Sequence, residues 1–291
     1  MNILLVGGAG YLGIPLSRKL KSNGHSVTIY DCFKYNTQEH FHSSDCYVVG
    51  EVKNINDNLK CDLNSFDVIV YLSQPRLCEL VDIQQVKDSI SDFNSILDIL
   101  NGPKLIFISS CSVYGKTTEI VNENSHTIVT SLYSQMKIFC ESLLLEKQNP
   151  NYKILRLSTL YGESDYIRND VFINDMLNEI LKGNSIEIYD PTSKRPHLHV
   201  LDCAKIITQL LETGFDEKVL NIGYNELNIN KRDIINLIKN FIEFDLIEHD
   251  TYDSRDYHVD FTKLSKYVDN KHISYEMGVM NYLKREKLYI N

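Results

Sequence analysis

The chain has 291 residues, a length that suits one or two domains and can bury a large core. Its formal net charge of −9 argues against a nucleic-acid-binding surface, which needs clustered Lys and Arg. The first apolar run begins at residue 3 and is too short to span a membrane, and no signal peptide precedes it. We therefore expect a cytoplasmic protein with no membrane partner.

Seven cysteines are scattered along the chain, and no two of them have the spacing of a metal-binding pair. An odd number of unpaired cysteines is typical of a reducing compartment, where disulfides are rare. We expect buried free thiols at Cys32, Cys46, Cys61, Cys78, Cys111, Cys140 and Cys203.

The N-terminal half alternates short apolar runs with amphipathic segments. Runs that are apolar throughout are typical of strands in a parallel sheet buried between helices. The first strand, helix and strand together have the size of a βαβ unit. This alternation predicts a Rossmann-type, doubly wound α/β sheet. The expected strands are 3–6, 27–31, 46–50, 68–73, 104–110 and 152–158, and the expected helices begin at 14, 86 and 131.

The alternation weakens after Gly162, where short strands and helices mix and the last forty residues or so are polar and rich in turns. We predict a first domain at residues 1–162 and a smaller C-terminal α/β lobe at residues 163–291. The elements around residues 200–223 are candidates to return to the first sheet.

A glycine-rich loop joins the first strand to the first helix. Gly7, Gly10 and Gly13 let the backbone turn tightly and approach a pyrophosphate, while the helix N-terminus offers N–H donors. Asp31 ends the second strand, where a carboxylate accepts hydrogen bonds from the adenosine ribose and repels a 2′-phosphate. We therefore expect NAD rather than NADP as the cofactor, with the nearby Lys34 as the residue that could weaken this preference.

Tyr133 and Lys137 are one helical turn apart on the same face of a predicted helix. A tyrosine is a poor base at its ordinary pKa of about 10. A neighbouring ammonium favours the phenolate, and so lowers that pKa toward the working pH. The pair therefore indicates a proton-transfer couple.

The wide glycine spacing and the Tyr133–Lys137 pair resemble those of the extended short-chain dehydrogenases/reductases, the NAD-dependent epimerase/dehydratase family. The resemblance covers nearly the whole chain and is strongest in the first 165 residues. It implies that Ser110, Tyr133 and Lys137 are the catalytic residues, with Ser110 holding the reacting oxygen near the phenol. The adjacent Ser109 is the competitor, and strand alternation points it to the other face.

The same resemblance implies cofactor and substrate contacts. Arg76 stands where epimerases of the family carry a lysine near the cofactor phosphates, and Glu51 replaces an aspartate beside the adenine. The arginines expected to contact the diphosphate of a nucleoside-diphosphate sugar are Arg195 and Arg255. The implied cofactor-binding residues are Gly7, Gly10, Tyr11, Leu12, Gly13, Asp31, Glu51, Leu72, Arg76, Tyr133 and Lys137. The implied substrate-binding residues are Ser110, Ser112, Thr159, Arg195 and Arg255.

Some features of the family are missing or changed. Its 4,6-dehydratases carry an Asp-Glu pair after the catalytic residue, whereas this chain has Cys111 and Ser112, so we do not expect dehydration. Thr159 stands where many epimerases place an asparagine. His197 and His199 alternate on a predicted strand, but no third ligand is evident, so we expect no metal and treat His199 as structural.

The expected function is NAD-dependent redox chemistry at C4 of a nucleoside-diphosphate sugar, and foremost 4-epimerisation. A net dehydrogenase or a 4-ketosugar reductase would use the same residues. A third hypothesis is a nucleotide-binding sensor, against which the intact Ser110, Tyr133 and Lys137 argue. The resemblance also implies a homodimer, formed through the helices at about 84–100 and 131–148.

Overall fold

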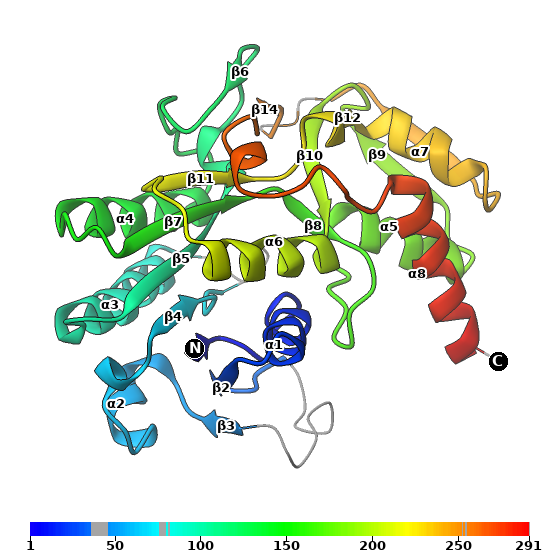
Figure 1. Cartoon of the computed structure of the whole chain (residues 1–291). Helices are drawn as coiled ribbons and strands as arrows, with labels where there is room; N and C mark the ends of the chain where they lie inside the picture. The colour runs from blue at the N-terminus through cyan, green and yellow to red at the C-terminus, as the bar shows by residue number, and fades with distance from the viewer. Residues whose placement is uncertain (36–45, 76–79, 81, 252, 254, 291) are drawn as a thin grey trace.

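The computed structural model describes residues 1–35, 46–75, 80, 82–251, 253 and 255–290, and Figure 1 shows the arrangement of its elements. A seven-stranded sheet, parallel throughout, forms the centre, in the order β11-β7-β5-β4-β1-β2-β3. Its strands are β1 (Asn2–Val6), β2 (Ser26–Asp31), β3 (Cys46–Val49), β4 (Val68–Tyr71), β5 (Lys104–Ser110), β7 (Tyr152–Leu157) and β11 (Val219–Ile222).

Helices pack in two pairs against this sheet. On one side α1 (Gly13–Ser22) contacts α6 (Val200–Thr213), and on the other α3 (Ile83–Ile99) contacts α4 (Leu132–Glu146) (Figure 1). The short α2 (Ile55–Asn58) follows β3. The predicted Rossmann-type α/β fold is confirmed. Within the described ranges no helix combines the length and the apolar composition needed to cross a bilayer.

The core explains why the first strand is apolar throughout. Ile3 and Leu5 belong to the apolar cluster on one side of the sheet, whereas Leu4 and Val6 belong to the cluster on the other side. All four side chains are fully buried. Because successive side chains of a strand point to opposite faces, a strand between two helical layers needs apolar residues at every position.

The remaining elements are shorter. Three small sheets join β8 (Thr159–Tyr161), β10 (Lys194–His199) and β12 (Asn228–Asn230); β9 (Ile186–Tyr189) and β13 (Leu246–His249); and β6 (Ile120–Val121) and β14 (His258–Val259). The helices are α5 (Phe172–Leu181), α7 (Lys231–Lys239) and α8 (Tyr275–Ile290), and single 3₁₀ turns are η2 (Val52–Asn54), η3 (Leu63–Ser65), η5 (Cys111–Tyr114), η6 (Asn225–Leu227) and η7 (Leu264–Lys266).

The segment after residue 200 contributes to both parts of the molecule. The strand β11 pairs with β7 at the edge of the large sheet, and α6 packs against α1. These elements therefore lie with the N-terminal residues, although they follow β8 and β10 in the chain. The domain boundary at residue 162 stays a prediction.

The cysteines differ from expectation. Cys111, Cys140 and Cys203 are buried free thiols, but Cys32, Cys46 and Cys61 are exposed free thiols, so the prediction of burial is wrong for these three. Cys32 follows the last residue of β2 and Cys46 opens β3 near the edge of the sheet, where no helix layer covers them. Cys78 lies outside the described residues.

Candidate active site

The carboxyl ends of four neighbouring strands meet at one edge of the sheet. β1 leads into Gly7, β2 ends at Asp31, β4 is followed by Leu72, and β5 ends at Ser110. The order of the strands reverses between β1 and β4, because β2 and β3 lie on one side of β1 and the later strands lie on the other. Ligands of open α/β sheets bind in the crevice at such a point.

Two glycines of the loop after β1 are required by close packing. Gly7 has a φ of +81°, and a Cβ there would lie 2.5 Å from the backbone nitrogen of Ser73. A Cβ at Gly13 would lie 2.4 Å from the carbonyl oxygen of Gly8. At Gly10, by contrast, a Cβ would meet only the Gly7 carbonyl oxygen, at 3.6 Å. The first helical turn is thus open at Gly10, as an approaching pyrophosphate requires.

Tyr11 ties this loop to the second half of the chain. Its phenol donates to the carbonyl oxygen of Gly162 at 2.6 Å and accepts from the Asn174 amide at 3.1 Å. The hydroxyl of Ser164 donates to the Tyr11 carbonyl oxygen at 3.1 Å. Burial raises the pKa of Tyr11, so the phenol stays protonated and acts as a donor. Leu12 is buried beside it.

Asp31 faces a cavity beside the glycine loop. One carboxylate oxygen accepts from the Ala9 N–H at 2.9 Å, and the other accepts from the Phe33 N–H at 2.8 Å. Burial raises the pKa of Asp31, and these two bonds oppose the effect. The cavity of about 530 Å³ is lined by Tyr30, Asp31, Cys32, Gly50, Glu51, Val52, Lys53, Ser73, Asp88, Ser91 and Asp92.

This cavity and the open turn at Gly10 fit the adenosine and pyrophosphate of NAD. Glu51 lines the cavity and pairs with Lys53 at 2.6 Å. Leu72 is half-buried, and its N–H donates to the Val6 carbonyl oxygen at 2.7 Å, beside the glycine loop. Arg76, expected near the cofactor phosphates, lies outside the described residues.

The helix α4 carries the Tyr133–Lys137 pair. Its first turn is closed by a capping box between Ser131 and Ser134. Lys137 is buried, and its Nζ donates to the carbonyl oxygen of Ile108 at 2.6 Å. The same Nζ lies 5.4 Å from the centre of the Tyr133 ring. The ammonium is therefore held between the phenol and strand β5, two residues before Ser110.

The serines at the end of β5 point in different directions. Ser109 is buried, and its hydroxyl donates to the carboxylate of Glu141 on α4. Ser110 is half-buried, and its hydroxyl oxygen accepts from the Ser112 N–H at 3.1 Å. Ser112 presents a buried hydroxyl without a hydrogen-bond partner among the described residues. Ser110 thus lies on the face of β5 opposite to Ser109, next to Ser112 in η5.

A buried ion pair fixes α4 to the sheet. Arg156 on β7 donates from Nη2 to Glu141 at 2.6 Å, and their side chains are 6% and 4% exposed. Burial alone would lower the pKa of Arg156, but the hydrogen bond and charge of Glu141 raise it above its ordinary value. Glu141 is one turn beyond Lys137 on α4, so this pair joins the helix to β7 near the proposed proton-transfer couple.

The structure adds two residues that the sequence did not indicate. Arg168 pairs with Asp170 at 2.6 Å, and its pKa is raised by Asp170 and by Tyr133 against the effect of burial. Tyr257 is buried, and burial raises its pKa, while Arg195 and Arg255 oppose the shift and Tyr133 adds to it. Both residues therefore lie in electrostatic range of Tyr133, although no motif or periodicity marks either one.

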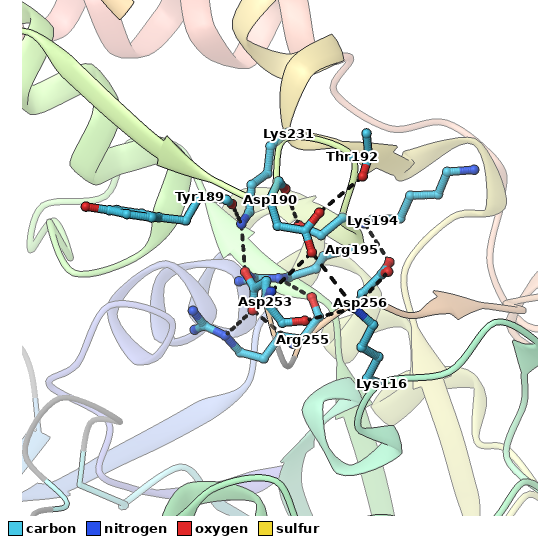
Figure 2. A network of polar contacts seen from close by, with 11 residues as sticks. Lys116, Tyr189, Asp190, Thr192, Lys194, Arg195, Lys231, Asp253, Arg255 and Asp256 are labelled. Carbon is cyan, nitrogen blue, oxygen red and sulfur yellow. Dashed lines mark hydrogen bonds and ion pairs between the residues drawn. The ribbon is translucent and has the colours of Figure 1, made fainter. Parts of the chain in front are cut away.

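Arg195 and Arg255 meet in one network of charges, which Figure 2 shows. Arg195 on β10 and Lys231 at the start of α7 both bind the carboxylate of Asp253. Arg255 binds the other oxygen of that carboxylate, at 3.4 Å from Nε. The two arginines predicted to contact a diphosphate are thus joined through a carboxylate, and Tyr257 interacts electrostatically with both of them and with Tyr133.

The other predicted positions are structural neighbours of this network. Thr159 is half-buried and pairs with His197 across β8 and β10. His199 caps α6, accepting from the Leu201 N–H, and its other ring nitrogen lies 3.0 Å from Glu163. Among the described residues no group of three His, Cys, Asp or Glu side chains could hold a metal ion.

Comparisons with known proteins agree with this fold. A family model described as the NAD dependent epimerase/dehydratase family matches residues 3–223. A curated relative, the UDP-N-acetyl-alpha-D-glucosaminuronate decarboxylase of Bacillus cytotoxicus, is 24% identical over 240 residues, covering 76% of this chain and 74% of the relative.

Two solved structures share the fold over almost the whole length. The UDP-glucose 4-epimerase of Thermotoga maritima with UDP-glucose has a TM-score of 0.85 at 20% identity, with 100% of each chain covered. The dTDP-glucose 4,6-dehydratase of Bacillus anthracis in complex with NAD has a TM-score of 0.82 at 21% identity, covering 99% of this chain and 97% of the other. Epimerases, dehydratases and decarboxylases are thus all similar to this chain.

Proposed function

Because the chain belongs to the NAD dependent epimerase/dehydratase family, we propose that it is a nucleotide-sugar 4-epimerase that uses NAD. One observation carries the proposal. The Lys137 ammonium is held by the Ile108 carbonyl oxygen beside Tyr133, at the same sheet edge as Ser110 and the cavity at Asp31. The proposed base, its activating cation and the proposed dinucleotide site thus lie along one edge of the sheet.

The residues divide the proton chemistry between them. Tyr133, as phenolate, takes the proton of the C4 hydroxyl, and the ammonium of Lys137 stabilises the negative charge on the phenol. Ser110 donates a hydrogen bond to the reacting oxygen, and the free hydroxyl of Ser112 is available to the sugar. Bound NAD supplies the acceptor for the C4 hydride. Epimerisation would require the hydride to return to the opposite face of C4 while Tyr133 gives its proton back to the oxygen, and the cycle would then end without net oxidation.

The substrate diphosphate is assigned to the charged network around Arg195 and Arg255. A diphosphate needs cations, and this network holds Arg195, Lys231 and Arg255 around a carboxylate. Electrostatic contacts of Tyr257 with both arginines and with Tyr133 connect the network to the proposed base. A sugar lying between the two would place C4 at Tyr133.

We also propose that the chain does not act as a 4,6-dehydratase, although a dehydratase shares the fold. The position after Ser110 holds Cys111, a fully buried thiol that donates to the Arg156 carbonyl oxygen at 3.3 Å. Burial raises the pKa of this thiol, so it is neither an acid nor a base near neutral pH. Neither Cys111 nor Ser112 supplies the carboxylate expected of a 4,6-dehydratase.

The first experiment examines the protein as purified. After denaturation, NAD released in a one-to-one ratio supports an internal hydride cycle, and screening of nucleotide sugars for 4-epimerisation follows. Release of NADH supports a net dehydrogenase or reductase. So does a protein that releases no nucleotide but turns over when cofactor is added. Failure to bind either NAD or NADP at millimolar concentration would refute both functions.

We also propose that the enzyme is a cytoplasmic homodimer. The α3–α4 side of the molecule exposes large apolar residues: Ile83 is 47%, Phe139 is 51% and Leu145 is 43% exposed. Two copies packed through these helices would cover them. Sedimentation equilibrium tests the idea, and a monomer at all concentrations would exclude it.

A further inference from the structure

We propose that Gln74, in the segment that follows β4, is a further substrate-binding residue whose amide binds a hydroxyl of the hexose. This inference rests on the proposed function, because it adds a residue for the sugar within the site described there. It assigns Gln74 to the hexose alone, and to neither the nucleoside diphosphate nor NAD.

The Gln74 side chain has polar atoms that the protein leaves unsatisfied. Its Nε2 and Oε1 are both buried, and neither has a hydrogen-bond partner in the described part of the chain. An amide offers two N–H donors and an acceptor oxygen, and burying them without hydrogen bonds is unfavourable. Most buried polar groups in folded proteins are paired, so an amide with both ends unpaired is suited to a polar ligand.

The segment that carries Gln74 leads from the cofactor cavity toward the proposed base. Ser73 lines the cavity assigned to adenosine, and a Cβ at Gly7 would lie 2.5 Å from the backbone of Ser73. Leu80, farther along the chain, belongs to a buried apolar cluster against which Tyr133 packs. Gln74 comes directly after Ser73, so its main chain begins the path between these two parts of the crevice.

Gln74 and Ser110 occupy matching positions beyond two neighbouring parallel strands. Tyr71 on β4 is opposite Phe107 on β5, and Gln74 and Ser110 each stand three residues beyond that pair. Tyr71 and Phe107 share the apolar cluster that packs against α3 and α4. An odd number of steps along an extended chain reverses the face, and a residue before a proline, as Gln74 is before Pro75, favours the extended conformation. We therefore expect Gln74 to share with Ser110 the face that is turned away from α3 and α4.

This position indicates the hexose as the ligand. The proposed mechanism places Ser110 on the oxygen at C4, so a side chain level with Ser110 on the same face is next to the sugar. The diphosphate is assigned elsewhere, to the network around Arg195 and Arg255. A sugar hydroxyl both donates and accepts hydrogen bonds, as an amide does. Because Gln74 has no charge, it matches a neutral hydroxyl better than a phosphate, which calls for a cation.

The test measures binding to the full chain with NAD present, by calorimetry. The probes are UDP-glucose and dTDP-glucose, with UDP and dTDP as the forms that lack the sugar. Gln74→Leu removes the amide and keeps a side chain of similar size. It should weaken binding of the nucleotide sugar by about 10-fold, because a hydrogen bond to the hexose is lost. The affinities for the sugar-free diphosphate and for NAD should stay as in the wild type.

Stability separates a ligand-binding amide from a structural one. Replacing an unpaired buried amide by leucine should leave the midpoint of thermal unfolding unchanged or raise it. Gln209→Leu is the matched control, because the Oε1 of Gln209 on α6 is also buried and has no partner within the described ranges. The control should keep its stability and bind the nucleotide sugar like the wild type. A lower midpoint for Gln74→Leu, or a failure to fold, would assign the amide a structural role and overturn the proposal.

The binding results separate two failures. If the wild type binds neither nucleotide sugar, the proposed substrate class is wrong and this inference falls with it. If the wild type binds one of them and Gln74→Leu binds it equally tightly, only the inference is overturned. An equal loss for the nucleotide sugar and its sugar-free diphosphate, or a loss of NAD affinity, would also overturn it, because the amide would then act on the nucleotide or the cofactor.

Discussion

The crevice around Tyr133 and the charged network around Asp253 are built on different principles. In the crevice, Lys137 is buried but its partner is a main-chain carbonyl of β5, so the contact follows once helix and strand are packed. In the network, Arg195 and Lys231 both bind the carboxylate of Asp253, so three side chains from separate segments are needed. The first arrangement is a product of secondary structure. The second depends on every charged member being present.

The largest effect should come from the crevice. Tyr133→Phe removes the proposed base while leaving the ring, so turnover should fall by about 10²- to 10⁴-fold. NAD binding should fall far less than turnover, because the ring remains and Lys137 keeps its bond to the Ile108 carbonyl oxygen. Two measurements check these expectations. Steady-state kinetics with an identified nucleotide sugar give the turnover, and the NAD content of the purified variant reports cofactor binding. Turnover near that of the wild type would show that Tyr133 is not the base.

The next effect is on stability, through the ion pair that joins α4 to β7. Glu141→Ala leaves the buried Arg156 guanidinium without its carboxylate, and should cost about 3–5 kcal/mol in the free energy of unfolding. The control is Glu179→Ala, whose partner Lys182 is 56% exposed, so its free energy of unfolding should stay close to that of the wild type. Urea denaturation measures both. Equal losses would mean that α4 does not depend on the pair.

The charged network should contribute to stability in a way that is lost in acid. The cations around Asp253 lower its pKa from an ordinary 3.8 to about 2, despite burial. The folded pKa is the lower one, so the stabilisation is complete above pH 4 and is lost as the pH falls toward 2. We expect this stabilisation to be about 1–2 kcal/mol. It is measured as the difference in the free energy of unfolding between the wild type and Asp253→Asn. A difference that does not shrink over this range would contradict the assignment.

The smallest effect concerns the cofactor cavity. Asp31→Asn removes the carboxylate expected to repel a 2′-phosphate, so the preference for NAD over NADP should fall about 10-fold. Both dissociation constants are needed, because the backbone bonds from Ala9 and Phe33 to Asp31 also weaken. If the ratio of the dissociation constants for NAD and NADP is unchanged, the selectivity belongs to the neighbouring carboxylates of Asp88 and Asp92, which line the same cavity.

The sequence predicted the first of these two regions far better than the second. Gly7, Gly13 and Asp31 are recognisable because a tight turn and a strand end impose residue types at fixed spacing. Tyr133 and Lys137 are recognisable because one helical turn separates them. Arg195 and Arg255 were named from resemblance, but nothing in the spacing of Lys231 or Asp253 indicates that either joins them.

By itself, the sequence determined the Rossmann-type fold and the residues at the carboxyl ends of its strands, because apolar periodicity and turn chemistry act over a few residues. Only the tertiary structure decided that Arg195 is buried while Arg255 is exposed, that Asp253 joins them, and that Arg168 and Tyr257 lie near Tyr133. Those outcomes depend on contacts between distant segments, and solvent exposure and charge pairing exist only once these segments have packed.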